Sequence, residues 1–469
     1  MNTHTRVTTI ILAAGQGTRM KSVLPKVLHP ISGRPMLHYV IDAAMAAGSD
    51  EVVVVTGHGR AQVNAYVTET FGAKARIAVQ AEQRGTGDAV RVALEQVSHE
   101  ADLLLLLCGD TPLLDAAELA QLIGLLRANA TRPLAMMTVR PSDPAGYGRI
   151  LRDGAGNIVG VREHKDASLE ERAIVETNPG VYVARASFLR DAITQIRPDN
   201  AQRELYLTDV VALAALGGGV ASQLVRDPMN VVGINDRAQL AEAEDTMYRR
   251  IADAHRRAGV TVRTSARIDA SVAIEPDAVI EHDVVLRGAT RIGPGAVIDV
   301  GSVLTHVSVA AGANVKPYTV ATSSKIGEKA QIGPFSHLRP ESDVDADAHV
   351  GNFVEMKKTH LGRGAKANHL AYLGDGEIGA GANIGAGTIF CNYDGFKKHR
   401  TEIGEGAFIG SDSQLVAPVR IGAGAYVATG TTVTRDVPDD ALAIARVKQE
   451  NKDGYASKLR ARLKAGSGK

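Results

Sequence analysis

The fold of the second half of this 469-residue chain is decided by the stretch Ile403-Gly-Glu-Gly-Ala-Phe-Ile-Gly-Ser-Asp-Ser-Gln-Leu-Val-Ala-Pro-Val-Arg-Ile-Gly-Ala-Gly-Ala-Tyr-Val-Ala-Thr-Gly-Thr-Thr-Val433. An aliphatic residue returns here at every sixth position, namely at Ile403, Ile409, Leu415, Ile421, Val427 and Val433. A period of six fits neither an α-helix nor a long alternating strand. It fits short strands joined by tight turns, with the aliphatic side chains inward and small residues at the corners.

The same period occurs earlier in this half, at Ile292, Ile298, Ile326, Ile332, Leu338, Val344, Val350, Ile378 and Ile384. Three such hexads make one triangular coil of about eighteen residues in hexapeptide-repeat proteins. The pattern resembles a left-handed parallel β-helix. We expect interruptions near Met356–His360 and across Phe390–Glu402, and loops that break a solenoid are frequent functional sites.

The first half has a different pattern, in which apolar strand-like runs alternate with helical stretches. The runs Thr8–Ala14, Glu51–Thr56 and Leu103–Leu107 read as strands, and Met36–Ala47 and Ala89–Val97 as helices. This alternation predicts a Rossmann-like α/β domain with a parallel sheet covered by helices.

The chain is therefore expected to have four parts. An α/β domain covers residues 1–233, and a charged helical arm covers 234–259. The β-helix covers 260–445. A tail rich in Lys and Arg, 446–469, is expected to be mostly solvated.

Composition limits the partners and the compartment. The chain has 53 basic and 52 acidic residues, so no global charge favours nucleic acid or a membrane as partner. Its two cysteines, Cys108 and Cys391, are far apart, which argues against a disulfide framework and suits a reducing cytoplasm. The longest wholly apolar run, Leu103–Cys108, is too short to span a bilayer.

A glycine loop follows the first predicted strand, in Leu12-Ala-Ala-Gly-Gln-Gly-Thr-Arg-Met20, with Pro25-Lys26 shortly after. It lacks the Gly-Lys-Ser/Thr of a Walker A loop, and Met20 occupies the third glycine position of G-x-G-x-x-G. Backbone N–H groups of such a turn can still approach phosphates. Arg19 and Lys26 can neutralise charge on a transferring phosphoryl group.

A carboxylate ends the most apolar strand, in Cys108-Gly109-Asp110. The carboxyl edge of an α/β sheet is where ligands bind, and an oxygen donor there suits Mg²⁺. Taken alone, Asp110 is equally well explained as a turn residue before Thr111-Pro112.

These motifs together resemble the sugar-1-phosphate nucleotidyltransferases. The resemblance implies that Arg19 and Lys26 activate UTP and that Asp110 and Asn235 hold Mg²⁺. It assigns the contacts of UTP and the nucleotide sugar to Leu12, Ala13, Ala14, Gly15, Lys26, Gln80, Gly85, Thr86, Cys108, Gly109, Asp110, Gly148, Glu163, Asn178 and Asn235. Two departures from the family are Cys108, where Tyr is frequent, and Pro179, where Thr is common.

A second candidate site lies in the β-helix half. His369, in Asn368-His-Leu-Ala-Tyr372, could act as the general base that acetyl transfer to an amine needs. A single His on a solenoid is more often structural. Arg339 and Lys357 could clamp a sugar phosphate.

This half is similar to the glucosamine-1-phosphate acetyltransferase half of the bacterial bifunctional uridyltransferases, and the resemblance covers nearly the whole chain. It implies that His369 is the base, that glucosamine-1-phosphate binds Arg339, Lys357, Tyr372 and Asn383, and that the protein is a homotrimer. The acetyl-CoA contacts that it implies are Ala386, Asn392, Tyr393, Ser411, Thr429 and Arg446. Asn368, Ala371 and Thr429 depart from the residues usual in the family.

Three alternatives are weighed against this interpretation. A zinc carbonic anhydrase of the β-helix class would use His337, His349 and His360, but a spacing of twelve puts the first two on different faces. A regulatory subunit with a degenerate nucleotidyltransferase would have lost residues such as Lys26 and Asp110. A transferase for another sugar or base would leave the residues around His369 unexplained.

Overall fold

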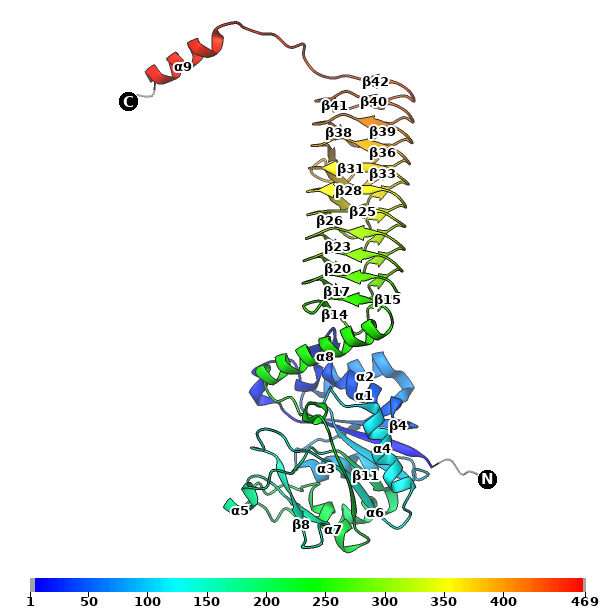
Figure 1. Ribbon diagram of the computed structural model, residues 1–469, viewed down its shortest axis with the longest axis vertical. Helices are drawn as coiled ribbons and strands as arrows, with labels where there is room; N and C mark the ends of the chain where they lie inside the picture. Colours follow the sequence, from blue (N-terminus) through cyan, green and yellow to red (C-terminus); the bar gives the residue numbers. More distant parts are fainter. Residues whose placement is uncertain (1–4, 467–469) are drawn as a thin grey trace. The chain divides into compact units, whose positions relative to one another are not determined.

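The computed structural model describes residues 5–466, which divide into two compact units (Figure 1). The first unit extends to Arg250 and the second begins at Ile251. Within the described residues, no helix is both long and apolar enough to cross a membrane.

The first unit is an α/β domain, as the sequence predicts. Among the described residues, its main sheet has seven strands in the order β12-β7-β11-β6-β1-β4-β5. Their bounds are β1 Val7–Ala13, β4 Glu51–Thr56, β5 Ala75–Val79, β6 Leu103–Cys108, β7 Leu134–Thr138, β11 Tyr182–Arg185 and β12 Val220–Leu224. The helices are α1 Met36–Ala46, α2 Arg60–Phe71, α3 Thr86–Leu94, α4 Ala116–Arg127, α5 Leu169–Arg172, α6 Ala186–Ala192 and α7 Asp209–Leu216.

Both faces of this sheet are buried. Leu105 belongs to one hydrophobic cluster and Leu106 to another, because successive side chains of a strand point to opposite faces. A sheet covered on both faces explains why Leu103–Leu107 is continuously apolar rather than alternating.

The predicted parallel sheet contains one antiparallel strand. β11 runs antiparallel to both β6 and β7. The chain first forms a small sheet of β8 (Gly148–Arg152), β9 (Ile158–Arg162) and β10 (Thr177–Asn178), in the order β10-β8-β9. Gly180 then lies against the Cys108 sulfur at the carboxyl end of β6, so the chain enters β11 from that edge.

The charged helix predicted after the first domain is α8, Arg237–Arg257. The division between the two units falls within it. In the first unit, Arg250 donates hydrogen bonds to the Leu113 carbonyl at 2.7 Å and to Asn230 Oδ1 at 2.5 Å.

The second unit is a stack of coils whose strands form three parallel sheets, here called the first, second and third walls. The first wall comprises β13 Thr261–Val262, β16 Val279–Ile280, β19 Val297–Ile298, β22 Asn314–Val315, β25 Gln331–Ile332, β28 His349–Asn352, β31 Lys366–His369, β34 Asn383–Ile384, β37 Phe408–Ile409, β40 Tyr426–Val427 and β42 Leu442–Ala443. The second wall comprises β14 Arg267–Ile268, β17 Val285–Arg287, β20 Val303–Thr305, β23 Val320–Thr322, β26 His337–Leu338, β29 Glu355–Lys357, β32 Tyr372–Gly374, β35 Ile389–Cys391, β38 Gln414–Val416 and β41 Thr432–Val433. The third wall comprises β15 Ala273–Ile274, β18 Arg291–Ile292, β21 Ser308–Val309, β24 Lys325–Ile326, β27 Asp343–Val344, β30 His360–Leu361, β33 Gly376–Ile378, β36 Thr401–Ile403 and β39 Val419–Ile421.

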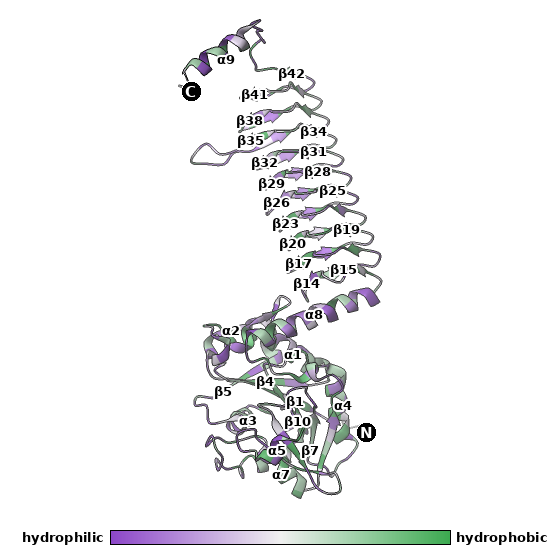
Figure 2. Ribbon diagram, turned by 60° about the vertical axis from the view of Figure 1, so that its left-hand side comes forward, coloured by the Kyte–Doolittle hydropathy of each residue, from purple (hydrophilic) through white to green (hydrophobic). Residues whose placement is uncertain are grey.

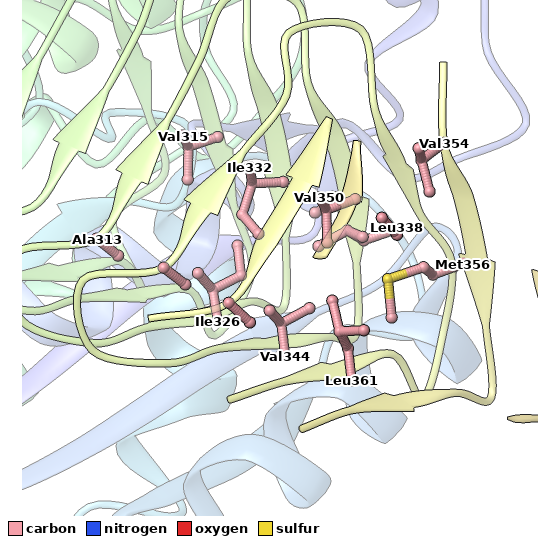
Figure 3. Packing of buried hydrophobic residues seen from close by; sticks show 14 of the residues in the cluster. Ala313, Val315, Ile326, Ile332, Leu338, Val344, Val350, Val354, Met356 and Leu361 are labelled. Atoms are coloured by element: carbon pink, nitrogen blue, oxygen red, sulfur yellow. The ribbon is translucent and has the colours of Figure 1, made fainter. Parts of the chain in front are cut away.

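The six-residue period describes this stack correctly. Ile403, Ile409 and Leu415 lie on the third, first and second walls in turn, and all three are buried. Figure 3 shows the same arrangement in earlier coils, where Ile326 and Ile332 point into the interior. One hexad therefore supplies one side of the triangle.

The six-residue period is interrupted near Met356–His360 as expected, but by a shortened step and not by a loop. Met356 is buried on β29, and the next inward residue, Leu361, follows five positions later on β30. A side of the triangle can have five residues because the missing residue is lost from the corner between the strands, and both strands are kept. The second expected interruption is a loop after β35, which Figure 2 shows leaving the stack. Beyond the stack, α9 (Tyr455–Gly466) is fully exposed.

Candidate active sites

A pocket of about 270 Å³ opens at the carboxyl ends of β1 and β6 in the first unit. Its lining residues are Leu12, Ala13, Ala14, Gly15, Lys26, Val27, Gln80, Gln83, Gly85, Thr86, Ala89, Cys108, Asp110 and Glu204. Ten of the fifteen residues predicted to contact UTP or the nucleotide sugar are among them. The lining also contains Val27, Gln83, Ala89 and Glu204, which the sequence motifs did not indicate. Gln83 lies inside the motif around Gln80, whereas Glu204 has no nearby sequence signal.

The glycine loop brings Lys26 to this pocket. Gly17 has φ +63°, and a Cβ on it would lie 2.6 Å from the Cβ of Lys26. Glycine is therefore required both for the backbone conformation and for the space that Lys26 occupies. Arg19, in the short 3-10 helix Thr18–Met20, is exposed and does not line the pocket.

Three predicted residues meet at the polar end of the pocket. The Lys26 Nζ bonds to Asp110 Oδ2 and lies 3.3 Å from Asn235 Oδ1. A hydrogen bond from Ile234 N to the Asp110 carbonyl, at 2.9 Å, ties the segment before α8 to the end of β6. The side-chain oxygens of Asp110 and Asn235, which are distant in sequence, thus both accept hydrogen bonds from the Lys26 ammonium group.

The opposite end of the pocket is built by the segment after β5. Gly85 has φ +107°, and a Cβ there would lie 2.5 Å from the Leu205 carbonyl oxygen. Thr86 begins α3, and its hydroxyl accepts a hydrogen bond from Leu207 N at 3.0 Å. These contacts hold the segment against the chain before α7.

Three predicted sugar-pocket residues lie beyond the pocket lining, around the small sheet. The Thr208 hydroxyl donates to Glu163 Oε1 at 3.0 Å, and burial raises the Glu163 pKa although this hydrogen bond opposes the rise. Asn178 donates from Nδ2 to the buried Tyr182 hydroxyl at 2.6 Å. A Cβ on Gly148 would lie 3.6 Å from Glu163 Oε2, so this glycine borders the carboxylate.

Cys108 and Gly109 lie between the nucleotide pocket and the predicted sugar-binding residues around the small sheet. The Cys108 Sγ is 4.0 Å from the Gly180 carbonyl, and burial raises the pKa of this thiol to about 12. The Gly109 N–H donates to the Leu12 carbonyl at 2.9 Å. The position where the family often has Tyr therefore holds a small, protonated side chain.

In the second unit, the predicted phosphate clamp lies on the outer face of the second wall. Arg339 and Lys357 stand on successive coils, because Arg339 N bonds to the carbonyl next to Lys357. Arg339 pairs with Glu355 at 2.7 Å. The pKa of Lys357 is lowered, mainly by its hydrogen bond to Lys398 and the charge of that residue and to a smaller degree by the charge of Arg339. Lys398 comes from the loop after β35. The two consecutive lysines of this loop, Lys397 and Lys398, are the one sequence feature that could have suggested a phosphate contact there.

Tyr372 and Asn392 share a space next to this clamp. A Cβ on Gly374 would lie 2.6 Å from the Tyr372 hydroxyl and 2.7 Å from Asn392 Nδ2. Asn392 Nδ2 donates to Asp375 Oδ2 at 2.6 Å. Tyr393 is exposed, and its hydroxyl donates to the Gly395 carbonyl at 2.6 Å.

His369 is exposed at the corner between the first and second walls. Backbone hydrogen bonds along this corner, such as Gly387 N to the Leu370 carbonyl and Asp412 N to the Ala386 carbonyl, stack successive coils. The predicted base and predicted acetyl-CoA contacts thus form one column, made of His369, Ala386, Ser411 and Thr429. The Arg446 guanidinium donates to the Thr429 carbonyl, and Asn383 pairs with Lys366 on the first wall.

The three histidines of the carbonic anhydrase alternative lie on three different walls. His337 is on β26, His349 on β28 and His360 on β30. His360 is paired instead with Asp345 at 3.1 Å and Glu377 at 2.5 Å. Among the described residues, no group of three or more His, Cys, Asp and Glu side chains is arranged to hold a metal ion.

Comparisons with known proteins agree with both halves. The MobA-like NTP transferase domain matches residues 9–207, and the bacterial transferase hexapeptide, as six repeats, matches residues 400–435. The bifunctional protein GlmU of Sorangium cellulosum (strain So ce56) is 68% identical over 463 residues, which cover 98% of each chain. GlmU of Anaeromyxobacter sp. (strain Fw109-5) is 52% identical over 97% of this chain and 94% of its own length. For GlmU of Trichlorobacter lovleyi the identity is 47% over 96% of this chain and 98% of that protein.

Such identity over nearly the full length, with both domain types in the same order, settles the family. The chain belongs to the GlmU family of bifunctional proteins.

Proposed function

We propose that the chain makes UDP-N-acetylglucosamine in two steps. The second unit transfers an acetyl group from acetyl-CoA to glucosamine-1-phosphate, and the first unit joins the product to UMP from UTP, releasing pyrophosphate. The observation that carries this proposal is that each unit brings together residues expected for its own reaction, Lys26 with Asp110 and Asn235 in one and Lys357 with Arg339 in the other.

In uridylyl transfer, the phosphate oxygen of the sugar attacks the α-phosphorus of UTP. Lys26 contacts the triphosphate, and the N–H groups of the glycine loop orient it. Arg19 is exposed beside the pocket and contacts the phosphates once UTP is bound. Glu163 and Asn178 contact the sugar. Positioning and charge neutralisation supply most of the rate because the protein does little covalent chemistry.

Asp110 and Asn235 are the residues that would hold Mg²⁺. Their oxygens converge on one cation already, Lys26, and hard oxygen donors suit this metal. When bound, Mg²⁺ would neutralise phosphate charge.

In acetyl transfer, Arg339, Lys357 and Lys398 bind the phosphate of the amino sugar. His369 removes a proton from its ammonium group, since only the free amine is a nucleophile. The amine attacks the thioester carbonyl, and the C–S bond breaks so that coenzyme A leaves as its thiolate. The second proton lost from the nitrogen passes to this thiolate. Ala386, Ser411, Thr429 and Arg446 line the corner along which coenzyme A extends, with Asn392 and Tyr393 beside it.

Homotrimer formation is part of the proposal. Tyr318, Phe335 and Phe353 are exposed aromatic side chains at the corner that carries His369, and their rings stack at 5.3 Å and 5.6 Å. Leu370, 61% exposed, continues this aromatic ladder next to His369. An apolar ladder of this length in water is typical of an interface. A second copy seated on it would lie beside the base.

Two single substitutions separate the activities. Asp110→Ala should reduce pyrophosphate release at least about a hundredfold, because charge stabilisation of the triphosphate is lost. His369→Ala should reduce acetyl transfer about a hundredfold to ten-thousandfold. Each variant should keep the other activity, measured as pyrophosphate release and as coenzyme A release.

The coupled reaction provides the control. Glucosamine-1-phosphate, acetyl-CoA, UTP and Mg²⁺ should yield UDP-N-acetylglucosamine with the wild type but not with His369→Ala. N-acetylglucosamine-1-phosphate should restore the product for that variant. Uridylyl transfer that persists in Asp110→Ala would refute the assignment of the first site.

A further inference from the structure

Gln80 is a buried amide whose two ends have different surroundings. It is 4% exposed and lines the nucleotide pocket. Its Nε2 donates to Asp88 Oδ2 at 2.9 Å and to the Gly85 carbonyl at 3.2 Å. Both amide hydrogens are therefore used on the protein side, and among the described residues no hydrogen bond to Oε1 is made.

The orientation of this amide is fixed by Asp88. Turning the amide over would place Oε1 against a carboxylate and a carbonyl, two groups that can only accept hydrogen bonds. Asp88 is 3% exposed and cannot turn aside easily, because its other oxygen accepts from Arg91 Nε at 3.2 Å and Nη2 at 2.6 Å. A carboxylate acceptor also makes a stronger hydrogen bond than a neutral one.

The location of Asp88 stabilises its charge without using the pocket. It lies in the first turn of α3, where the helix dipole favours a negative group. Asp88 itself does not line the pocket. Its influence on a bound nucleotide must therefore pass through Gln80.

We propose that Asp88 is a positioning residue that sets the pyrimidine selectivity of the first site by locking Gln80 with its oxygen available to the base. This rests on the proposed uridylyl transfer, with the uracil of UTP bound beside Gln80, Gly85 and Thr86, the segment that resembles the uracil-reading segment of the family. Uracil offers an N3–H donor, which matches an acceptor, whereas N3 of cytosine is itself an acceptor and would repel Oε1. Discrimination against CTP then depends on the amide being unable to turn over.

The test compares kcat/KM for UTP and CTP in pyrophosphate release with N-acetylglucosamine-1-phosphate. Asp88→Asn puts a donor within reach of Oε1, so the amide can turn, and the UTP-to-CTP ratio should fall at least about tenfold. The matched control is Glu95→Gln, which removes one charge from the exposed end of the same helix and should leave the ratio unchanged.

A double-variant cycle distinguishes positioning from general damage. Gln80→Ala alone should lower the ratio, and adding Asp88→Asn to it should change the ratio no further. Loss of stability would lower both kcat/KM values together and leave their ratio intact. Acetyl-transfer activity, measured on the same preparation of each variant, shows that the chain has folded. If Asp88→Asn does not fold, Asp88→Ser is used in its place.

The outcomes separate this inference from the proposed function. Wild type that fails to release pyrophosphate from UTP would overturn the proposed function itself. A wild type selective for UTP, with the same ratio in the Asp88 variants, would overturn only the role of Asp88. An equal effect of Asp88→Asn with and without Gln80 would also overturn it.

Discussion

At the scale of single residues, Cys108 shows how burial decides reactivity. Its thiol pKa of about 12 leaves roughly one thiolate in ten thousand at pH 8, against about a quarter for an ordinary thiol. Cys108 and Cys391 are both partly exposed, but burial raises the pKa of Cys391 less far.

We therefore expect iodoacetamide to alkylate Cys391 before Cys108 in the folded protein at pH 8. The rate at Cys108 should rise as the pH approaches 12, because only the thiolate reacts. Mass spectrometry of the peptides measures both rates, and a urea-unfolded sample, in which they should be similar, is the control. Equal rates in the folded protein would contradict the raised pKa of Cys108.

Which residues the sequence could identify depended on whether their signal was local. The glycine loop and Cys108-Gly109-Asp110 each follow a strand directly, so their placement at the sheet edge could be predicted. The Asp88 carboxylate is three residues from Gly85 in sequence, but its hydrogen bond to Gln80 depends on the angle at which α3 leaves the loop. Lys398 was missed because the path of an irregular loop is not encoded in a period.

At the scale of elements, the six-residue period predicted the walls of the β-helix because each hexad has one inward position. It could not predict that the step from Met356 to Leu361 is a continuing side of five residues, since corners can be shortened without loss of the inward residue. In the first unit, the positions of β1, β4 and β6 were predicted, but β11 and its direction were not. Direction depends on where the chain returns from the small sheet.

One ion-pair cluster joins the third wall to the loop after β35. Glu377 accepts from His360 at 2.5 Å and also bonds to Arg400 from that loop. Burial lowers the pKa of His360, but its hydrogen bond to Glu377 and the charge of Asp345 outweigh this, so the pKa is raised overall. The folded state therefore binds the proton more tightly than the unfolded chain.

This sign predicts a pH dependence of stability. The contribution of His360 is complete below its unfolded pKa of about 6.5 and is lost as the pH rises through the raised folded value. His360→Gln should thus lower the melting temperature of the second unit at pH 5.5 more than at pH 8.5. Because water screens a ring this exposed, the contribution is at most about 1 kcal/mol, or about 4 °C.

Calorimetry of the full chain measures this difference at each pH. His337→Gln, on the second wall without such carboxylate partners in the described contacts, is the matched control and should shift the transition equally at both values. A His360→Gln effect that grows with pH would contradict the sign.

At the scale of the whole molecule, the aromatic ladder predicts how assembly and activity are coupled. Phe335 stacks between Tyr318 and Phe353 and is 47% exposed. Phe335→Ser should convert a trimer to monomers and abolish most acetyl transfer, because the second copy would no longer cover the corner of His369. Uridylyl transfer should remain.

Sedimentation velocity and the two activity assays test this together. Phe408→Ser is the matched control, since Phe408 is an exposed aromatic stacked on Tyr426 at 4.5 Å but lies outside the ladder. A Phe335→Ser trimer, or a monomer with full acetyl transfer, would contradict the proposed interface. The expected boundaries at 233, 259 and 445 also remain predictions, which limited proteolysis can address.

The stacking of coils has one more consequence. Each coil rests only on the coil before and the coil after, so a local opening spreads along a single axis. The end of the stack at β42 should lose its backbone hydrogen bonds first, because the last coil has a neighbouring coil on one side only. The coils that carry Arg339, Lys357 and His369 lie well inside that end, whereas the proposed acetyl-CoA contacts Thr429 and Arg446 lie in the last coils. Opening of the end would therefore disturb acetyl-CoA binding before it reaches the proposed phosphate clamp and the base.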